Sequence, residues 1–124
     1  MAIEAIHHVQ LAMPPGREDE ARQFYGVLLD IAEVPKPPHL AVRGGCWFEH
    51  GDLRVHLGVE EDFRAAKKAH PALLVSELPA LVAKLKDAGV RVVDNQSLEG
   101  FDRVYVDDPF GNRIELLEPL AVAS

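Results

Sequence analysis

The first pattern along the chain is an alternation of hydrophobic and polar positions that predicts a strand over Ile3–Met13. Side chains of a strand point alternately to its two faces, so its residues divide by parity. The more apolar set is assigned to a core covered by helices, and its members are Ala5, His7, Val9, Leu11 and Met13. His8 and Gln10 are then expected on the opposite face, and the run Pro14-Pro15-Gly16 ends the strand.

A helical spacing follows this strand. The apolar positions recur at i, i+3, i+4 and i+7, and they are Ala21, Phe24, Tyr25 and Leu28. Three short strands are predicted next, near 31–35, 40–49 and 53–59, with a turn at His50-Gly51-Asp52 between the last two. The first half of the chain is therefore predicted to have the order β-α-β-β-β.

The polar segment 60–69 is predicted to be a helical connector, after which the pattern starts again. His70 to Val75 is the next predicted strand, because a residue before proline favours an extended backbone. Ser76 is expected to cap a helix that Gly89 ends. The apolar positions of that helix are Leu78, Leu81, Val82, Leu85 and Ala88. Strands predicted near 90–94, 102–107 and 113–118 complete a second β-α-β-β-β series.

The two halves are interpreted as one repeat. His8 and His70 open the two series and lie 70 − 8 = 62 residues apart, which is half of the 124-residue chain. We therefore predict an α+β fold of two β-α-β-β-β modules, approximately 1–59 and 70–120, within a single domain over 1–124. We expect a pseudo-twofold axis to relate the modules, and their sheets to form a cupped, incomplete barrel around a shared cavity.

Polar residues of the strands fall on the faces opposite the apolar ones. Arg54 and His56 do so in one strand, and Arg113 and Glu115 do so in another. If the modules pair, four side chains of the metal-ligating type converge, and they are His8, His56, His70 and Glu115. Imidazole and carboxylate ligands suit Zn, Ni, Fe or Mn, and a metal with open positions can bind a substrate through two oxygens.

Composition and charge narrow the possible partners. The chain has 13 Lys and Arg against 20 Asp and Glu, a formal net charge of −7, and its basic residues are scattered. This argues against nucleic acid and membranes as partners and leaves a small polar or anionic molecule open. A single cysteine, Cys46, allows no internal disulfide, and the N-terminal sequence has no basic leader or long apolar segment. We therefore expect a cytoplasmic protein.

Three features of the sequence together resemble the vicinal oxygen chelate superfamily. They are the paired modules with His8 in Ile-His-His-Val-Gln-Leu-Ala, the Phe24-Tyr25 pair, and the closing run Asp-Pro-Phe-Gly-Asn-Arg-Ile-Glu-Leu from Asp108 to Leu116. The superfamily includes glyoxalase I, methylmalonyl-CoA epimerase, extradiol dioxygenases, fosfomycin-modifying enzymes and bleomycin-resistance proteins. The resemblance covers essentially the whole chain, and the closing run is specific for the superfamily rather than for one activity.

The resemblance implies a divalent metal held by first-strand histidines and a last-strand glutamate, which here are His8, His70 and Glu115. In glyoxalase I a fourth ligand, a glutamate, comes from the last strand of the first module, and this chain departs from that pattern with His56. Three ligands suffice in the fosfomycin enzymes, so His56 is either a possible fourth ligand or a base or substrate-binding residue. The resemblance also implies a homodimer.

The expected function is that of a glyoxalase-like, metal-dependent lyase or isomerase acting on a small oxygen-rich metabolite or xenobiotic. The divalent metal (Zn, Ni, Mn or Fe) would chelate two substrate oxygens, and Glu115 or His56 would move the proton. Substrate contacts are expected from Gln10, Arg54, Arg103, Tyr105 and Arg113. The alternatives are a non-catalytic, antibiotic-sequestering protein of the bleomycin-resistance type, and a fosfomycin-type thiol transferase or a dioxygenase.

Overall fold

The structure, a computed structural model, describes residues 2–94 and 98–121. The chain divides into two compact units, Met1–Arg64 and Ala65–Ser124. The boundary falls inside 60–69, the segment expected to connect the two modules. Among the described residues, no helix combines the length and the apolar character needed to cross a membrane.

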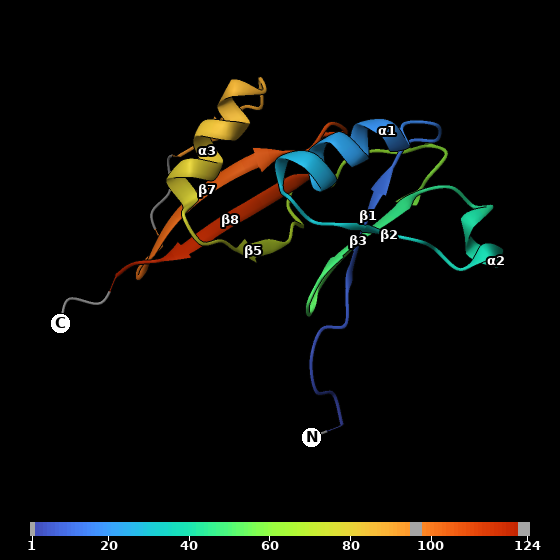
Figure 1. The fold of residues 1–124 in the computed structure, drawn as a ribbon, viewed down its shortest axis with the longest axis horizontal. Coiled ribbons are helices and arrows are strands. Elements are labelled where there is room, and N and C mark those ends of the chain that lie inside the picture. The colour runs from blue at the N-terminus through green and yellow to red at the C-terminus, as the bar shows by residue number, and fades with distance from the viewer. Residues whose placement is uncertain (1, 95–97, 122–124) are drawn as a thin grey trace. The chain divides into compact units, whose positions relative to one another are not determined.

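Each unit contains one four-stranded mixed sheet (Figure 1). The first unit has β1 (Val9–Met13), α1 (Glu18–Ala21), η1 (Arg22–Leu28), β2 (Glu33–Val34), α2 (Pro38–Ala41), β3 (Cys46–His50) and β4 (Leu53–Val59). The second has β5 (Ala72–Leu74), α3 (Leu78–Asp87), β6 (Val92–Val93), β7 (Phe101–Asp107) and β8 (Arg113–Pro119). In both sheets the first strand pairs in parallel with the last, in the orders β1-β4-β3-β2 and β5-β8-β7-β6. This confirms the predicted α+β class and the repeated β-α-β-β-β order.

The helix of the first unit changes character along its length. Its first turn, α1, carries three acidic residues at the positive end of the helix dipole. It continues as the π-helix η1, in which the N–H of Leu29 donates to the carbonyl oxygen of Phe24, five residues earlier, at 2.9 Å. The apolar positions predicted from the helical spacing are buried, and they are Ala21, Phe24, Tyr25 and Leu28.

The hydrophobic cores confirm the predicted faces of the strands. In the first unit, Val55 of β4 lies opposite Phe48 of β3, and Leu57 lies opposite Cys46, all four being buried. In the second unit, the buried hydrophobic residues of β7 and β8 are Val104, Val106, Ile114 and Leu116. Because alternate residues point to opposite faces, the polar residues of these strands are left on the other face of each sheet.

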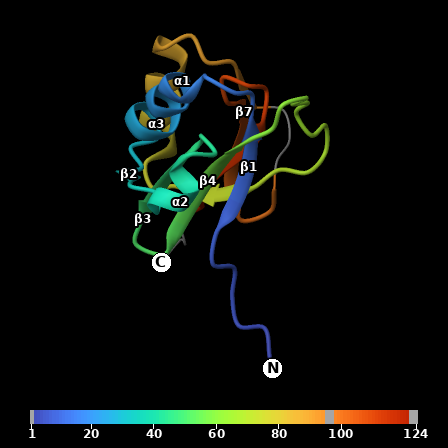
Figure 2. The same ribbon diagram turned by 90° about the vertical axis from the view of Figure 1, so that its right-hand side faces the viewer.

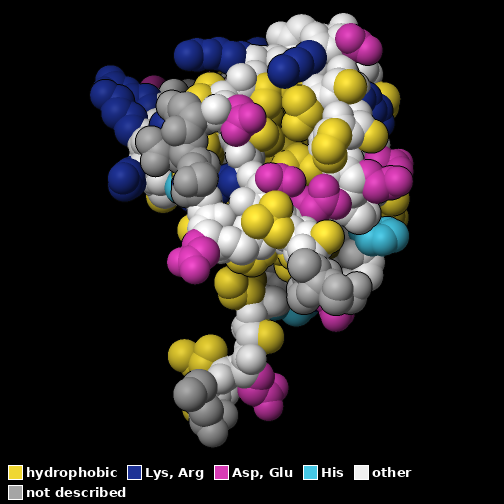
Figure 3. Space-filling view, turned by 90° about the vertical axis from the view of Figure 1, so that its left-hand side faces the viewer, with side chains coloured by type: hydrophobic (Ala, Val, Ile, Leu, Met, Phe, Trp, Pro, Cys, Tyr) yellow, Lys and Arg dark blue, Asp and Glu magenta, His cyan; other side chains and the backbone are white. Residues whose placement is uncertain are grey.

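The N-terminal segment is not a strand along its whole predicted length. β1 begins only at Val9, opposite Val55 of β4, so the strand predicted over Ile3–Met13 is wrong for residues 3–8. These residues precede β1 and extend away from the strand toward the N-terminus (Figures 1 and 2). Figure 3 shows hydrophobic side chains along this segment, where Ile3 is 81% exposed. An alternating pattern becomes a strand only where a neighbour supplies hydrogen-bond partners for its backbone.

Two other predicted elements are wrong. The strand expected over 40–49 begins only at Cys46, because α2, with proline at its start, precedes it and the glycines at 44 and 45 adopt positive φ angles of 77° and 82°. The segment 60–69 forms turns and bends rather than the expected helix. Its composition favours a helix, but ten residues without an apolar stripe gain too little to form one.

A side chain of β8 caps the N-terminus of α3. The helix starts after Glu77, which has a φ angle of 57°. Glu118 of β8 accepts hydrogen bonds from the backbone N–H groups of Glu77, at 2.6 Å, and Leu78, at 3.0 Å. The expectation that Ser76 caps this helix is therefore wrong: the carboxylate takes that place at the positive end of the helix dipole. Gly89, with a φ angle of 83°, follows the helix as predicted.

Candidate functional site

The two candidate histidines of the first unit lie against each other and against a tryptophan. Trp47 and His56 are direct neighbours across β3 and β4, and their rings stack with centroids 4.1 Å apart. His8, just before β1, stacks on the same imidazole with centroids 4.4 Å apart. The two rings leave His56 only 4% exposed, although it lies on the polar face predicted from parity.

Glu49 fixes the orientation of the His56 ring. Its Oε2 atom lies 3.1 Å from Nε2 of His56. Burial lowers the pKa of His56 from its ordinary value, and the hydrogen bond to Glu49 opposes this effect only in part. The imidazole is therefore neutral at neutral pH, with its Nε2–H donating to Glu49 and its lone pair on Nδ1. A neutral imidazole is the form that binds a metal or accepts a proton.

Gln10 lies next to His56 on the same face of the sheet. The two residues are register partners across β1 and β4. A Cβ atom at Gly58 would lie 2.7 Å from Nε2 of Gln10, so the glycine leaves the space that the amide occupies. Gln10 and Trp47 line a cavity of about 230 Å³ together with Lys36 and Arg43. The predicted substrate-binding residue Gln10 is thus at a cavity beside the buried imidazole.

The second unit brings together His70 and Glu115. The N–H of Glu115 donates to the carbonyl oxygen of Pro71 at 3.0 Å, which fixes the two segments against each other. His70 Nε2 then lies 2.8 Å from Glu115 Oε1, while His70 Nδ1 lies 2.8 Å from the carbonyl oxygen of Lys68. Arg103 Nη1 lies 3.4 Å from Glu115 Oε2. The Glu115 carboxylate, 7% exposed, thus has a partner at each oxygen, as a buried charge requires.

Tyr105 connects this pair to two arginines. It lies opposite Glu115 across β7 and β8, and its ring centroid is 5.6 Å from that of His70. The guanidinium carbons of Arg103 and Arg113 lie 5.2 and 5.4 Å from the Tyr105 ring centroid, within reach of a cation–π interaction. Three predicted substrate-binding residues therefore adjoin the predicted metal ligands of this unit.

Arg54 is held by the chain just before β1, because its Nη1 donates to the carbonyl oxygen of His7 at 3.1 Å. The sequence-predicted residues thus gather in two groups, one in each unit. The group in the first unit is His8, Gln10, Arg54 and His56, and the group in the second is His70, Arg103, Tyr105, Arg113 and Glu115. Over residues 2–94 and 98–121, no three or more His, Cys, Asp or Glu side chains are gathered as a metal site would require.

Sequence reasoning missed the role of Glu49 and left Trp47 unassigned. Consecutive strand residues point to opposite faces, so only one of Trp47 and Phe48 can face the core, and the structure puts Phe48 there. Trp47 and Glu49 share the face of His56 because they alternate on the neighbouring strand. The turn at His50-Gly51-Asp52 could have predicted that Trp47 and Glu49 lie near His56, because the turn of a hairpin sets the register of its two strands.

Comparison with known proteins tests the resemblance directly. A model of the Glyoxalase/Bleomycin resistance protein/Dioxygenase superfamily matches residues 5–116. The chain belongs to this superfamily. A search of curated proteins finds no match.

Solved structures that are similar to this chain have the same fold. A glyoxalase family protein from Bacillus anthracis is 46% identical with a TM-score of 0.92, over 97% of this chain and 98% of that one. The fosfomycin resistance protein FosX from Listeria monocytogenes is 15% identical with a TM-score of 0.76, over 95% of each chain. TnmS3, an antibiotic-binding protein from a Streptomyces species, is 21% identical with a TM-score of 0.74, over 97% of this chain and 99% of that one. The two distant structures share the fold, and their activities are not transferred by it.

Proposed function

We propose that this chain is a glyoxalase-type, metal-dependent lyase or isomerase that acts on a small oxygen-rich molecule. His8, His70 and Glu115 would hold the divalent metal, and His56 would be a fourth ligand or a base. The observation that supports this most strongly is the arrangement of hydrogen-bonding atoms around His70.

The ring nitrogens of His70 face two acceptors. The carbonyl oxygen of Lys68 can only accept, so the proton of a neutral His70 lies on Nδ1. Its Nε2 lone pair then points at a carboxylate oxygen of Glu115, 2.8 Å away. Two lone pairs at this distance repel each other unless a cation lies between them, either a proton or a metal ion. A metal-ligating histidine commonly donates its other N–H to a backbone carbonyl, as His70 does here.

The separation of the two donor atoms also fits a shared metal. Zinc binds histidine nitrogen and carboxylate oxygen at about 2.0–2.2 Å, so two ligand atoms lie about 3.4 Å apart at the tetrahedral angle and about 3.0 Å apart at a right angle. The 2.8 Å between His70 Nε2 and Glu115 Oε1 is a hydrogen-bond distance, and the two side chains need to separate by only a few tenths of an ångström to share an ion. These two residues therefore fit the divalent ion that the resemblance implies.

The remaining roles follow from the chemistry of each side chain. A bound divalent ion would polarise the substrate oxygens as a Lewis acid. His56, kept neutral by burial, has its Nδ1 lone pair available to accept a proton, and Glu49 would stabilise the imidazolium that results. Glu115 is the second candidate base, and Arg103 holds one of its oxygens in place. Gln10, Arg54, Tyr105 and Arg113 would orient the substrate.

Proton exchange into a substrate panel tests this proposal. Protein loaded in turn with Zn, Ni, Mn or Fe(II) is incubated in D₂O with small α-hydroxycarbonyl compounds, and deuterium incorporation is followed by NMR. We expect metal-dependent exchange at the carbon next to the carbonyl, lost in Glu115→Gln and reduced about a hundredfold or more in His56→Gln if His56 is the base. A metal-loaded protein that exchanges no compound of the panel would contradict the enzymatic proposal.

One observation favours the alternative, a protein that binds a small molecule without catalysis. The Trp47 ring lines the cavity of about 230 Å³ beside Gln10, and an aromatic wall of this kind can stack on a flat ligand. Tight binding of such a ligand by metal-free protein, together with absent exchange, would favour this function.

The proposal also includes the homodimer that the resemblance implies. Light scattering of the purified protein checks this, and the expected mass is twice 13.7 kDa. A monomer at micromolar concentration would contradict it.

A further inference from the structure

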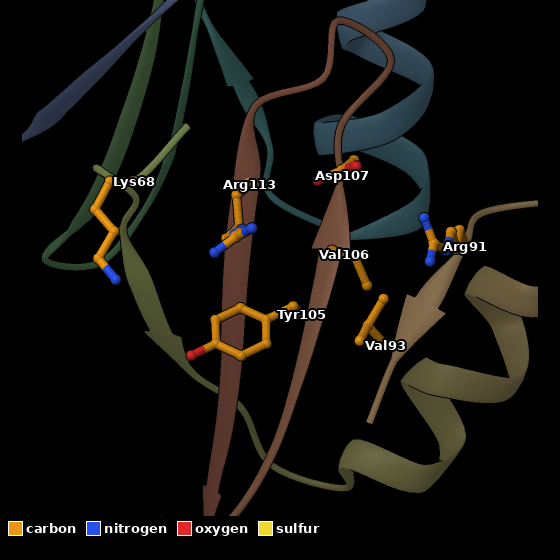
Figure 4. A pocket seen from close by; sticks show the side chains of 7 residues that line it. All are labelled: Lys68, Arg91, Val93, Tyr105, Val106, Asp107 and Arg113. Atoms are coloured by element: carbon orange, nitrogen blue, oxygen red, sulfur yellow. The ribbon is translucent and has the colours of Figure 1, made fainter. Parts of the chain in front are cut away.

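Besides His70 and Glu115, the pair of proposed metal ligands, the second unit contains a separate cavity of about 580 Å³ (Figure 4). This volume is in the range of pockets that bind small molecules. Basic side chains from three different segments line it: Lys68 before β5, Arg91 before β6 and Arg113 of β8. Asp107 at the end of β7 is the acidic residue among its lining residues.

The charge of this cavity is opposite to that of the chain. Three cations and one carboxylate give the lining a formal charge of 3 − 1 = +2, whereas the whole chain carries −7. Within the described part of the chain, Lys68, Arg91 and Arg113 form no ion pair with a carboxylate, Asp107 included. Cations that face one cavity repel one another unless an anion lies among them.

Tyr105 and Val93 supply the uncharged side chains of the lining. Figure 4 shows the Tyr105 ring beside Arg113, whose guanidinium carbon is 5.4 Å from the ring centroid. Val93 of β6 lies opposite Tyr105 and lines the cavity from the same face of the sheet, whereas the side chain of Val106 is buried in the core on the other face. An aromatic ring, an aliphatic group and three cations match an organic molecule that carries an oxyanion, rather than a bare inorganic ion.

The cavity adjoins the His70–Glu115 pair of the same unit through Tyr105. This residue lines the cavity and also lies opposite Glu115 across β7 and β8, with its ring 5.6 Å from that of His70. In Figure 4, Lys68 and Arg91 lie on opposite sides of the cavity, with Arg113 between them. A molecule whose anionic group lies beside Arg113 therefore has Tyr105 between that group and the His70–Glu115 pair.

We infer that this cavity binds the anionic group of a small organic oxyanion, a phosphate ester or a dicarboxylate, and that the substrate belongs to this class. The assignment of the anion as substrate rests on the proposed function, whereas the binding itself does not. Lys68 and Arg91 are the specificity residues that this inference adds. Arginine suits either group, because its planar donors match both phosphate and carboxylate.

Ligand titration of chelator-treated protein, followed by amide NMR at constant ionic strength, tests the inference. The probes are phenyl phosphate, phthalate and, as a neutral compound of similar size, benzyl alcohol. We expect saturable binding of at least one anion, with shifts at Tyr105, and no saturable binding of benzyl alcohol. Tighter binding of phenyl phosphate identifies phosphate as the preferred group, and tighter binding of phthalate identifies the carboxylate.

Matched variants separate this cavity from general charge attraction. Lys68→Gln and Arg91→Gln are each expected to weaken anion binding about tenfold, the loss of one charge-assisted hydrogen bond. Lys67→Gln removes the same charge one residue away, outside the lining, and should leave binding unchanged. Absence of saturable binding to both anions, or equal effects of Lys67→Gln and Lys68→Gln, would overturn the inference.

Because the titration uses metal-free protein, the two proposals can fail separately. Anion binding by a protein that takes up no metal would contradict the proposed function and support this inference. A metal-loaded, catalytically active protein whose cavity binds neither anion would support the proposed function and contradict this inference.

Discussion

The indole ring of Trp47 lies parallel to the imidazole ring of His56, with 7° between their planes and 4.1 Å between their centroids. This stacking is part of the burial that keeps water from His56, and burial is the main reason why the pKa of His56 lies below its ordinary value. A residue outside the group of expected ligands therefore contributes to the burial that lowers the pKa of one inside it.

Trp47→Ala should raise the pKa of His56 toward the value of about 6.5 that a hydrated histidine has. In the wild type, His56 binds a proton more tightly in the unfolded chain than in the folded protein. The neutral imidazole therefore contributes its full share to the free energy of unfolding above about pH 6.5. That contribution is lost as the pH falls from there through the pKa of His56 in the folded protein. NMR titration of metal-free protein measures the shift, with Trp47→Phe as the control that retains a stacked ring. An unchanged pKa in Trp47→Ala would show that Trp47 does not set the hydration of His56.

Glu118→Ala should destabilise the protein by about 1–2 kcal/mol, because the N–H groups of Glu77 and Leu78 lose a charged acceptor at the start of α3. Glu118→Gln keeps a neutral acceptor and should cost less. Urea unfolding measures both variants against Glu99→Ala, an exposed residue outside the helices and strands. Equal stability of Glu118→Ala and Glu99→Ala would contradict the capping role.

The sequence could predict whatever depends on local periodicity. The faces of β4, β7 and β8 follow from alternation, and the buried side of the first helix follows from its spacing. The π-helix η1 hardly changes the spacing of the apolar residues along the helix. Their positions therefore predict which side chains are buried, but not that the backbone hydrogen bonds join residues five apart instead of four.

What depends on a partner distant in sequence could not be predicted in this way. Ser76 is a good local cap, but Glu118 lies 41 residues after Glu77 and takes its place through the packing of β8. The alternation at residues 3–8 has no paired strand beside it, so it stays outside β1. Glu49 was missed for the same reason, since its contact with His56 exists only in the register of β3 with β4.

The thiol of Cys46 should be unreactive in the folded protein. Burial raises its pKa to about 11, so only about one thousandth of it is thiolate at pH 8, and its side chain is enclosed in the core. An aromatic disulfide reagent at pH 8 should therefore label the protein at the rate of unfolding, and immediately in denaturant. Rapid labelling of the native protein would contradict the burial of this residue.

Metal content is the most direct measure of the proposed site, in which His8, His70 and Glu115 would hold a divalent metal. Untagged protein, purified without chelator, is analysed by inductively coupled plasma mass spectrometry beside His8→Ala, Glu115→Ala and His39→Ala. His39 is an exposed histidine of α2 outside both groups of candidate residues, so its variant is the matched control.

We predict about one Zn, Ni, Mn or Fe ion per chain in the wild type and in His39→Ala, and its loss in both His8→Ala and Glu115→Ala. A wild-type protein that contains none of these metals and takes none up from a panel of divalent ions would contradict the proposed metal site.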